Sequence, residues 1–498
     1  MPDQLTQQKL ESTLWGAANA LRGPVDPGDF KAYVFPVLFF KWISDSWDYQ
    51  HAAALADWGD ELDDIIEADY QPFAIPDGCH WVDVHNTATN VGSKLNKTLQ
   101  RIQQANPQLA GVFGDVNWGN KERLPETALV ALLDAFHDVT LDPDHLTGDM
   151  LGAAYEYLLR EFAEASGRKA GEFFTPHHVV HLLVKILDPQ PGDHVIDPAC
   201  GSGGMLVETV NAVAAAGGNP DTLRLHGQEV NLTTSAIAAM NLYLHGLQDF
   251  EIRRGDTFRD PKFLDKGELR KFDVVIANPP FSLQNWGAAE WVNDRYGRAF
   301  CAVPPAKNAD YAWIQHMVAS TEEETGRVGV VMPHGVLFRG GKEGDIRQCL
   351  LEKDLLEAVI GLPNNLFYST SIPVCLLIFR KTKAKERRNK VLFVDATARS
   401  KPGTNQNTMD DDDIDAVHAA YAKGVDVDGE GGLHLRLVDM AEIADNRYDL
   451  NIGRYIQTEQ AAEVDVAAAL SAYRDARDAL RASERDLDKK LKAAGFDA

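Results

Sequence analysis

The segment from Phe272 to Phe281 combines an apolar strand pattern with groups that can bind a planar amine. Its first half is a β-branched, apolar run of the kind that forms a buried strand. Pro279 and Pro280 end that strand because proline cannot donate to a sheet ladder. Asn278, the Pro279 carbonyl and the Phe281 ring are thus left at the strand's carboxyl end, where open α/β sheets bind ligands. The two oxygens can accept both hydrogens of an exocyclic amine while the ring stacks on its base, although the same residues also fit a strand followed by a rigid turn.

A glycine-rich loop follows another apolar strand pattern upstream. Residues 194–197 have the composition of a short buried strand that ends in Asp197, and the loop Gly201-Ser202-Gly203-Gly204 comes shortly afterwards. Glycine lets the backbone approach a ligand closely, and the start of the following helix offers amide donors to a carboxylate or a phosphate. The spacing is not G-x-G-x-x-G, and no phosphate-binding lysine follows, which disfavours dinucleotides and nucleoside triphosphates.

Acidic residues end the next two strand patterns. Glu229 follows the pattern 223–228, and Asp256 ends the pattern 252–256. An acid at the end of the second strand commonly holds ribose hydroxyls, which makes Glu229 a candidate for that role and Asp256 a candidate for a purine edge or a second ribose contact. Each acid alone is also compatible with a solvated strand end. Together with the glycine-rich loop they indicate cofactor ligands.

Aromatic rings are presented from two turns. The segment Glu172-Phe173-Phe174-Thr175-Pro176-His177 places two rings and a hydroxyl directly before a helix, with the proline near its first turn. A loop between two later strand patterns presents Phe367 near the end of the sheet. The irregular segment 282–307 is compatible both with a cover over a substrate and with a packed surface loop.

The order of the patterns predicts a helical region followed by a doubly wound sheet. Strands and helices alternate over about 230 residues, which is typical of a mostly parallel, Rossmann-like α/β domain. We expect four parts: a helical N-terminal domain, the α/β domain, a linker or tail that contains an acidic loop at 410–413, and a long C-terminal helix with apolar residues every seven positions. Their expected bounds are 1–145, 146–400, 401–457 and 458–498. The basic run from Arg380 to Lys390 could contact phosphates, but a solvated face is the favoured interpretation.

Composition limits the partners and the compartment. The 498 residues carry 74 acidic and 49 basic side chains, a net charge of −25. A chain that binds DNA by itself usually has a basic surface, so a nucleic-acid substrate would imply that a partner provides part of the DNA contact. The alternative is that the acidic residues only confer solubility and that local basic patches are enough to bind DNA. The five cysteines are scattered, which predicts neither a disulfide framework nor a metal site. The polar N-terminus and the lack of a long apolar run predict a cytoplasmic protein without a membrane span.

The order of aromatic-Thr-Pro turn, glycine-rich loop, two strand-end acids and Asn-Pro-Pro-Phe resembles the gamma-ordered amino-methyltransferases of DNA. The chain is most similar to the modification subunits of type I restriction-modification systems. Three stretches carry this closer resemblance: the helix at Leu14-Trp15 with 35–43, the block 171–204, and the segment 446–451 before Arg454-Tyr455. The resemblance extends over nearly the whole chain.

The resemblance implies S-adenosylmethionine as the cofactor and no metal. By position, 172–177 would line the methionine and adenine side of the pocket, Asp197 and the loop 201–204 would face the methionine moiety, Glu229 would hold the ribose and Asp256 the adenine edge. Asn278, Pro279, Pro280 and Phe281 would hold a flipped-out target adenine for direct methylation at N6, and Phe367 would help to stack it.

The resemblance also implies partners. In type I systems a separate specificity subunit selects the site on double-stranded DNA, typically with two modification subunits, and a restriction subunit can join. The C-terminal helix is the candidate for docking on the specificity subunit. Alternatives are methylation of another planar amine, such as cytosine N4 or a protein glutamine, or a non-catalytic assembly subunit. Asn rather than Ser before Pro-Pro favours adenine, and the absence of a Pro-Cys dipeptide disfavours cytosine C5.

Overall fold

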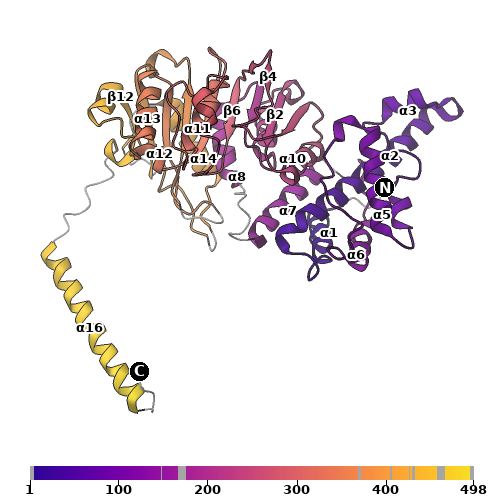
Figure 1. Ribbon diagram of the computed structural model, residues 1–498, viewed down its shortest axis with the longest axis horizontal. Helices are drawn as coiled ribbons and strands as arrows, with labels where there is room; N and C mark the ends of the chain where they lie inside the picture. Colours follow the sequence, from indigo (N-terminus) through magenta and orange to yellow (C-terminus); the bar gives the residue numbers. More distant parts are fainter. Residues whose placement is uncertain are drawn as a thin grey trace. The chain divides into compact units, whose positions relative to one another are not determined.

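The apolar strand patterns assemble into one ten-stranded sheet in the order β11-β12-β10-β8-β9-β7-β6-β1-β2-β3 (Figure 1). The structure is a computed structural model that describes residues 5–146, 149–166, 175–367, 372–403, 406–424, 427–428, 432–456 and 466–493. The strands of this sheet are β1 (His194–Asp197), β2 (Arg224–Glu229), β3 (Phe250–Arg254), β6 (Val274–Ala277), β7 (Arg327–Pro333), β8 (Leu356–Gly361), β9 (Val374–Arg380), β10 (Lys390–Asp395), β11 (Val427–Asp428) and β12 (His434–Asp439). A small hairpin adds β4 (Leu264–Asp265) and β5 (Glu268–Leu269).

The central strands are parallel, and the strands that follow β1 in the chain are added first on one side of it and then on the other. From β1 the chain proceeds outward through β2 and β3, and it then returns to place β6 on the other side of β1. β7 continues parallel to β6, whereas β9 is inserted antiparallel between β7 and β8. The reversal creates a crevice at the carboxyl ends of β1 and β6, where doubly wound sheets bind ligands. The predicted fold class is confirmed.

Helices cover the sheet and provide its apolar core. Those of the α/β region are α8 (His177–Leu187), α9 (Gly204–Ala215), α10 (Leu232–Leu244), α11 (Asp310–Ala319), α12 (Gly335–Phe338), α13 (Lys342–Glu352), α14 (Asp411–Lys423) and α15 (Met440–Asp445). α8 packs against α9, α14 and β7, while α10 lies on β3 and β2 and α11 on β6 and β7. α8 is amphipathic, whereas α10 and α11 are buried on nearly all sides, and this packing fixes the strand ends that carry the site.

The acidic segment 410–413 is a helix start and not the loop or linker that the sequence suggested. Asp410 caps α14, accepting a hydrogen bond from the Asp413 amide at 3.0 Å, while the Asp413 carboxylate accepts one from the Asp410 amide at 3.3 Å. Carboxylates are favourable at this end of a helix because they complement its dipole. The surrounding region also continues the sheet, since β12 pairs antiparallel with β10.

The basic run from Arg380 to Lys390 is tied into the structure, and the expectation of a solvated face is wrong for its main cations. The Arg380 guanidinium lies 2.9 Å from the Glu357 carboxylate. Lys383 is buried and pairs with Asp354, and Arg387 is buried and donates to the Tyr421 carbonyl. Buried cations require such partners because an unpaired one is costly to desolvate.

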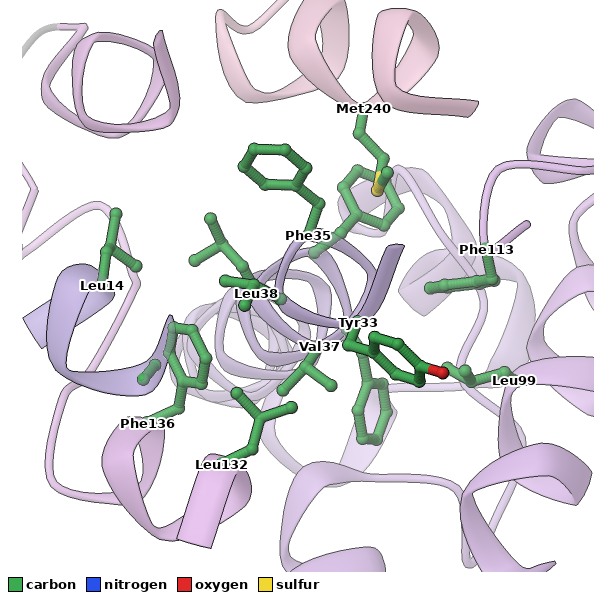
Figure 2. Packing of buried hydrophobic residues seen from close by; sticks show 14 of the residues in the cluster. Leu14, Tyr33, Phe35, Val37, Leu38, Leu99, Phe113, Leu132, Phe136 and Met240 are labelled. Atoms are coloured by element: carbon green, nitrogen blue, oxygen red, sulfur yellow. The ribbon is translucent and has the colours of Figure 1, made fainter. Parts of the chain in front are cut away.

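The N-terminal region is helical, as predicted. It comprises α1 (Gln7–Asn19), α2 (Phe30–Trp58), α3 (Asp64–Tyr70), α4 (Trp81–His85), α5 (Val91–Ala105), α6 (Glu126–His137) and α7 (Met150–Ser166). Figure 2 shows apolar side chains pointing from α2 in all directions, and most of the first half of this helix is buried. The same core cluster includes Met240 and Tyr243 of α10. The shared core fixes the start of α2 relative to the α/β region.

The segment 282–307 is a packed insertion that is covalently tied to α13. Trp286 and Trp291 are each 1% exposed, and their rings pack on Phe258. Cys301 forms a disulfide with Cys349, with 5.7 Å between their α-carbons. The sequence had predicted no disulfide. The two cysteines are 48 residues apart, and only the packing of the insertion against the end of the sheet brings them together.

The last helix, α16 (Val466–Ala493), belongs to a separate contact unit, Gly453–Ala498, whereas Met1–Ile452 forms the other. It confirms the predicted C-terminal helix. Its heptad residues Tyr473, Leu480 and Leu487 are all more than half exposed. Among the described residues, no helix combines the length and the apolar character that a membrane span requires.

Candidate functional site

A cavity of about 400 Å³ lies at the carboxyl ends of the central strands. This volume falls within the range of small-molecule sites, roughly 300–1,000 Å³. The cavity brings together most of the residues that the sequence singled out on separate strands. Its lining includes Gly201, Ser202, Glu229, Asp256, Asn278, Pro279 and Pro280.

The glycine-rich loop adopts a conformation that favours glycine. Gly201 and Gly203 have φ of 53° and 82°, in the left-handed region that side chains disfavour, and Gly203 is the N-cap of α9. The Gly201 amide donates to the Glu229 carboxylate at 3.1 Å, and the other oxygen of that carboxylate accepts from the Asn231 amide at 2.8 Å. Loop and strand-end acid are therefore held together as one wall of the cavity.

Asp197 lies beneath this wall as a buried acid. Its side chain is 2% exposed and accepts a hydrogen bond from the Ala199 amide at 2.9 Å. The pKa of the Asp197 carboxyl is raised to about 8, mainly by burial; the Ala199 hydrogen bond lowers the pKa and the nearby charge of Glu229 raises it.

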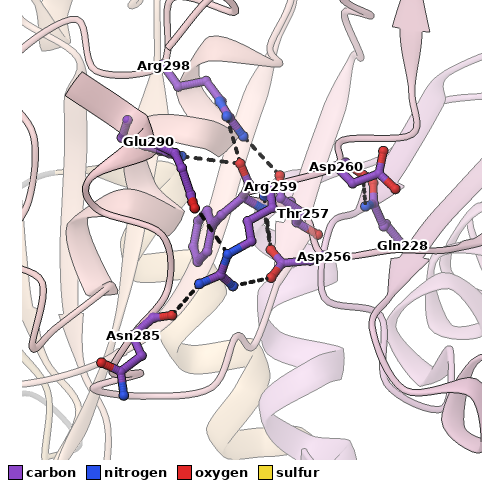
Figure 3. Close-up of polar contacts among 10 residues, drawn as sticks. Gln228, Asp256, Thr257, Arg259, Asp260, Asn285, Glu290 and Arg298 are labelled. Carbon is purple, nitrogen blue, oxygen red and sulfur yellow. Dashed lines mark hydrogen bonds and ion pairs between the residues drawn. The ribbon is translucent and has the colours of Figure 1, made fainter. Parts of the chain in front are cut away.

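Asp256 is bound to the loop that follows it. Figure 3 shows its carboxylate facing the Arg259 guanidinium, at 2.7 Å, and the amides of Phe258 and Arg259 donate to the same carboxylate at 2.9 and 3.1 Å. Arg259 also donates to the Asn285 carbonyl and lies 3.4 Å from Glu290. The strand-end acid is thereby fixed against the insertion.

The side-chain oxygen of Asn278 is a buried hydrogen-bond acceptor without a partner in the described part of the chain. The amide nitrogen of Asn278 donates to the Thr175 hydroxyl at 2.8 Å, while the oxygen is buried and has no hydrogen-bond partner among the described residues. Such a group costs about 1–3 kcal/mol unless a ligand satisfies it. Pro279 is buried, Pro280 is exposed, and the half-buried Phe281 packs against the core of the α/β region.

The aromatic segments are only partly brought to the site. Thr175 reaches Asn278, and Pro176 precedes α8. His177 lies 3.4 Å from Glu208, whose carboxylate raises the pKa of the imidazole. Glu172, Phe173 and Phe174 lie outside the described residues. Phe367 is 2% exposed within the core cluster, so its ring packs in the protein interior and its stacking role stays a prediction.

The sequence analysis missed one wall of the cavity. Gly28 reaches it from the 3₁₀ turn Pro27–Asp29, Lys31 from the first turn of α2, and Leu159 and Phe162 from α7. These residues lie in helices whose pattern indicated only packing. No local signal marks them, because their position at the cavity follows from the core shared by α2, α7 and α10.

The cavity fits S-adenosylmethionine. Apolar side chains of Leu159, Phe162 and Ile237 can face a purine, and the strand-end acids Glu229 and Asp256 can accept hydrogen bonds from hydroxyls and amines. With the glycine-rich loop at the switch point of the sheet, fold and site define an S-adenosylmethionine-dependent methyltransferase.

The chain belongs to the N-6 DNA Methylase family, whose family model matches residues 146–464. A second family model, the HsdM N-terminal domain, matches residues 10–136. The resemblance found in the sequence is thereby confirmed, and the methyl donor is S-adenosylmethionine.

Individual relatives agree with the family. The chain is 33% identical to the type I restriction enzyme MjaVIII methylase subunit of Methanocaldococcus jannaschii, over 93% of this chain and 81% of the relative. It is 33% identical to the MjaVII methylase subunit of the same organism over 78% of this chain, and covers 66% of that relative's length. A type I methyltransferase subunit from Streptococcus thermophilus superposes with a TM-score of 0.79 at 30% identity, covering 91% of this chain and all of that one.

Proposed function

We propose that the chain methylates N6 of adenine in double-stranded DNA, as the modification subunit of a type I restriction-modification complex. The observation that carries this proposal is the buried Asn278 oxygen, which has no hydrogen-bond partner among the described residues and lines a cavity that fits S-adenosylmethionine. The names of the relatives, all of them type I methylase subunits, support it.

Asn278 and Pro279 would act on the amine of the target base. An adenine inside a duplex is out of reach, so the base must be flipped out at a cost of roughly a few kcal/mol. The nitrogen lone pair of adenine is delocalised into the ring. Acceptance of both amine hydrogens by the Asn278 oxygen and the Pro279 carbonyl favours a more tetrahedral nitrogen, with the lone pair available for attack. Stacking on Phe281 would hold the ring, and no covalent intermediate with the protein is needed.

The remaining site residues would hold the cofactor in register with that base. S-adenosylmethionine supplies an electrophilic methyl group when it is bound. The loop 201–204 and Asp197 would bind the methionine moiety, Glu229 the ribose, Asp256 the adenine edge, and 172–177 the outer side of the pocket. Holding the methyl donor and the target amine in the reactive geometry contributes much of the rate, because the reaction then no longer depends on a chance collision in the correct orientation.

A specificity subunit would supply the grip on DNA that this chain, with its net charge of −25, is unsuited to provide alone. Two modification subunits per specificity subunit are the expected stoichiometry, with a restriction subunit as a further partner and the cytoplasm as the compartment. The exposed heptad residues of α16 suit a partner helix.

Nucleoside mass spectrometry of plasmid DNA from a methylation-deficient host tests the reaction. The chain is expressed alone and together with its candidate specificity subunit. We expect N6-methyladenine only in the presence of the partner. N4-methylcytosine would overturn the assignment of the base, and no modified base with cofactor still bound would direct the search to substrates other than DNA.

Co-purification tests the role of α16. Deletion of 458–498, or the pair Leu480→Lys and Leu487→Lys in the heptad positions, should weaken capture by the specificity subunit. The control pair Asp475→Asn and Asp478→Asn changes the net charge equally at other positions of the helix and should leave capture intact. Unchanged capture after the deletion would refute this docking role.

A further inference from the structure

The backbone directly after the Asn-Pro-Pro-Phe motif is held in an unusual conformation. Ser282 has a φ of 53°, in the left-handed region that residues with a side chain disfavour. Its amide donates to the Asp310 carboxylate at 2.7 Å. A residue in this region costs about 1–3 kcal/mol and persists only where its surroundings enforce it. The Asp310 bond is a direct constraint on the backbone of this turn.

Asp310 is itself rigidly placed. It is fully buried at the start of α11, and its own amide donates to the Asn308 side-chain oxygen at 2.9 Å. Its second carboxylate oxygen pairs with the Arg339 guanidinium, which also lies 2.8 Å from Glu343. A buried carboxylate with an arginine partner and an amide donor is satisfied on both oxygens and has little freedom to move.

Through Asp310, the loops after two neighbouring strands are joined. Ser282 belongs to the loop after β6, and Arg339 follows α12, which comes after β7. Arg347 supports the second loop because its guanidinium donates to the Arg339 carbonyl at 2.8 Å. The turn that carries Phe281 is thus anchored to a second strand end rather than only to its own strand.

We propose that Asp310 is a positioning residue for methyl transfer, which holds Ser282 in its left-handed conformation and so fixes the Pro279 carbonyl and the Phe281 ring against the target base. This inference rests on the proposed function, because it assigns a role within the same reaction. Asp310 does not contact the base; it acts through the backbone of Ser282.

Asp310→Ala removes the acceptor, and the turn can then relax out of the left-handed region. A displacement of about 1 Å at a reacting group can cost on the order of 100-fold in rate, and we expect a loss of that size in kcat. The affinity for S-adenosylmethionine, measured by calorimetry, should change far less than kcat, because of the proposed cofactor ligands Glu229 ends β2 and Asp256 follows β3. Both measurements use the chain assembled with its specificity subunit.

Rescue by glycine separates positioning from stability. Glycine adopts the left-handed conformation without strain. In the Ser282→Gly background, Asp310→Ala should therefore lower kcat by about tenfold or less, compared with about 100-fold in the wild type. If kcat fell only because the buried charge of Asp310 was lost, glycine at position 282 would not restore it. If Asp310→Ala does not fold, Asp310→Asn serves instead: it keeps an acceptor for the amide, weakens the contact with Arg339, and should cost about tenfold in kcat.

Glu357 supplies a matched control. It is also a buried acid with an arginine partner, Arg380, but it lies within β8 away from the turn. Glu357→Ala should lower the melting temperature as Asp310→Ala does and leave kcat unchanged. The positioning role of Asp310 would be overturned, and the proposed function left standing, by a wild-type kcat in Asp310→Ala or by a loss of kcat that Ser282→Gly does not relieve. A wild-type complex that forms no N6-methyladenine would overturn the proposed function and this inference with it.

Discussion

The two halves of the carboxyl edge treat their polar side chains differently. On the side proposed for the cofactor, Glu229 accepts hydrogen bonds from the amides of Gly201 and Asn231, and Asp256 accepts one from the Phe258 amide. On the side proposed for the target base, Asn278 is anchored through its nitrogen, and its oxygen is buried with no partner in the described part of the chain. One half has its acceptors engaged in building the site, and the other keeps an acceptor for a ligand.

This difference separates binding from catalysis. A loop that satisfies its own acids is stable before the cofactor arrives, so it can bind with little rearrangement. An unsatisfied buried acceptor costs about 1–3 kcal/mol, a cost that the amine of the base can remove when it enters. Changes on the cofactor side should therefore alter affinity, whereas changes on the base side should alter the rate.

Asn278→Ala gives the largest expected effect. It removes the acceptor that faces the amine and should lower kcat on the order of 100- to 1,000-fold, the range found when one preorganised polar group is lost. The affinity for S-adenosylmethionine should be retained. Methyl transfer to DNA and calorimetric cofactor binding are measured on the same preparation, and a joint loss of both would indicate a folding defect instead.

Asp256→Ala should weaken cofactor binding by about tenfold or more, since hydrogen bonds to a charged group are worth about 1.5–3 kcal/mol. At saturating cofactor, kcat should recover. Asp260→Ala is the control, because this acid lies on the same loop with its side chain 60% exposed and paired with Lys262. If Asp256→Ala and Asp260→Ala changed the affinity for S-adenosylmethionine equally, Asp256 would have no specific role in cofactor binding.

Asp197→Asn tests the buried acid through the pH dependence of stability. Its pKa is about 8 in the folded chain against a usual value of 3.8. Between these values the folded state holds a proton that the unfolded state has released, so stability falls as pH rises, by about 1.4 kcal/mol per pH unit. Asparagine cannot ionise and lacks this slope. Melting temperatures of the variant should therefore rise relative to the wild type between about pH 5 and pH 7, and parallel curves would contradict the assignment.

Gly203→Ala should have the smallest effect. A side chain at φ of 82° costs about 1–2 kcal/mol, but the added methyl would meet Ala238 at an ordinary 3.5 Å. We expect a similar loss of stability from Gly217→Ala, where φ is 79° and nothing lies within 4 Å. Only Gly203→Ala should also weaken cofactor binding, because it distorts the N-cap of α9 beside the cavity. Identical cofactor affinities would argue against a role of this cap in binding.

Local patterns in the sequence determined the strands, the glycine-rich loop, the two strand-end acids and the Asn-Pro-Pro-Phe motif. Proline and glycine restrict their own backbone, and a buried strand must be apolar, so these features can be recognised without a partner in space. The acidic segment at Asp410 was misread because an N-cap and a loop share the same residue types, and only the helix that follows distinguishes them.

Tertiary structure alone decided the rest of the site. Lys31 and Phe162 reach the cavity through helices that the sequence marks only as packed, Cys301 meets Cys349 across 48 residues, and the Asp310 carboxylate meets Ser282 across 28. Each of these contacts joins residues that are far apart in the chain. Such contacts depend on how the helices and strands pack, which no local pattern reports. The sequence determines the chemical groups at each strand end, and the fold decides which distant side chains hold those groups in place.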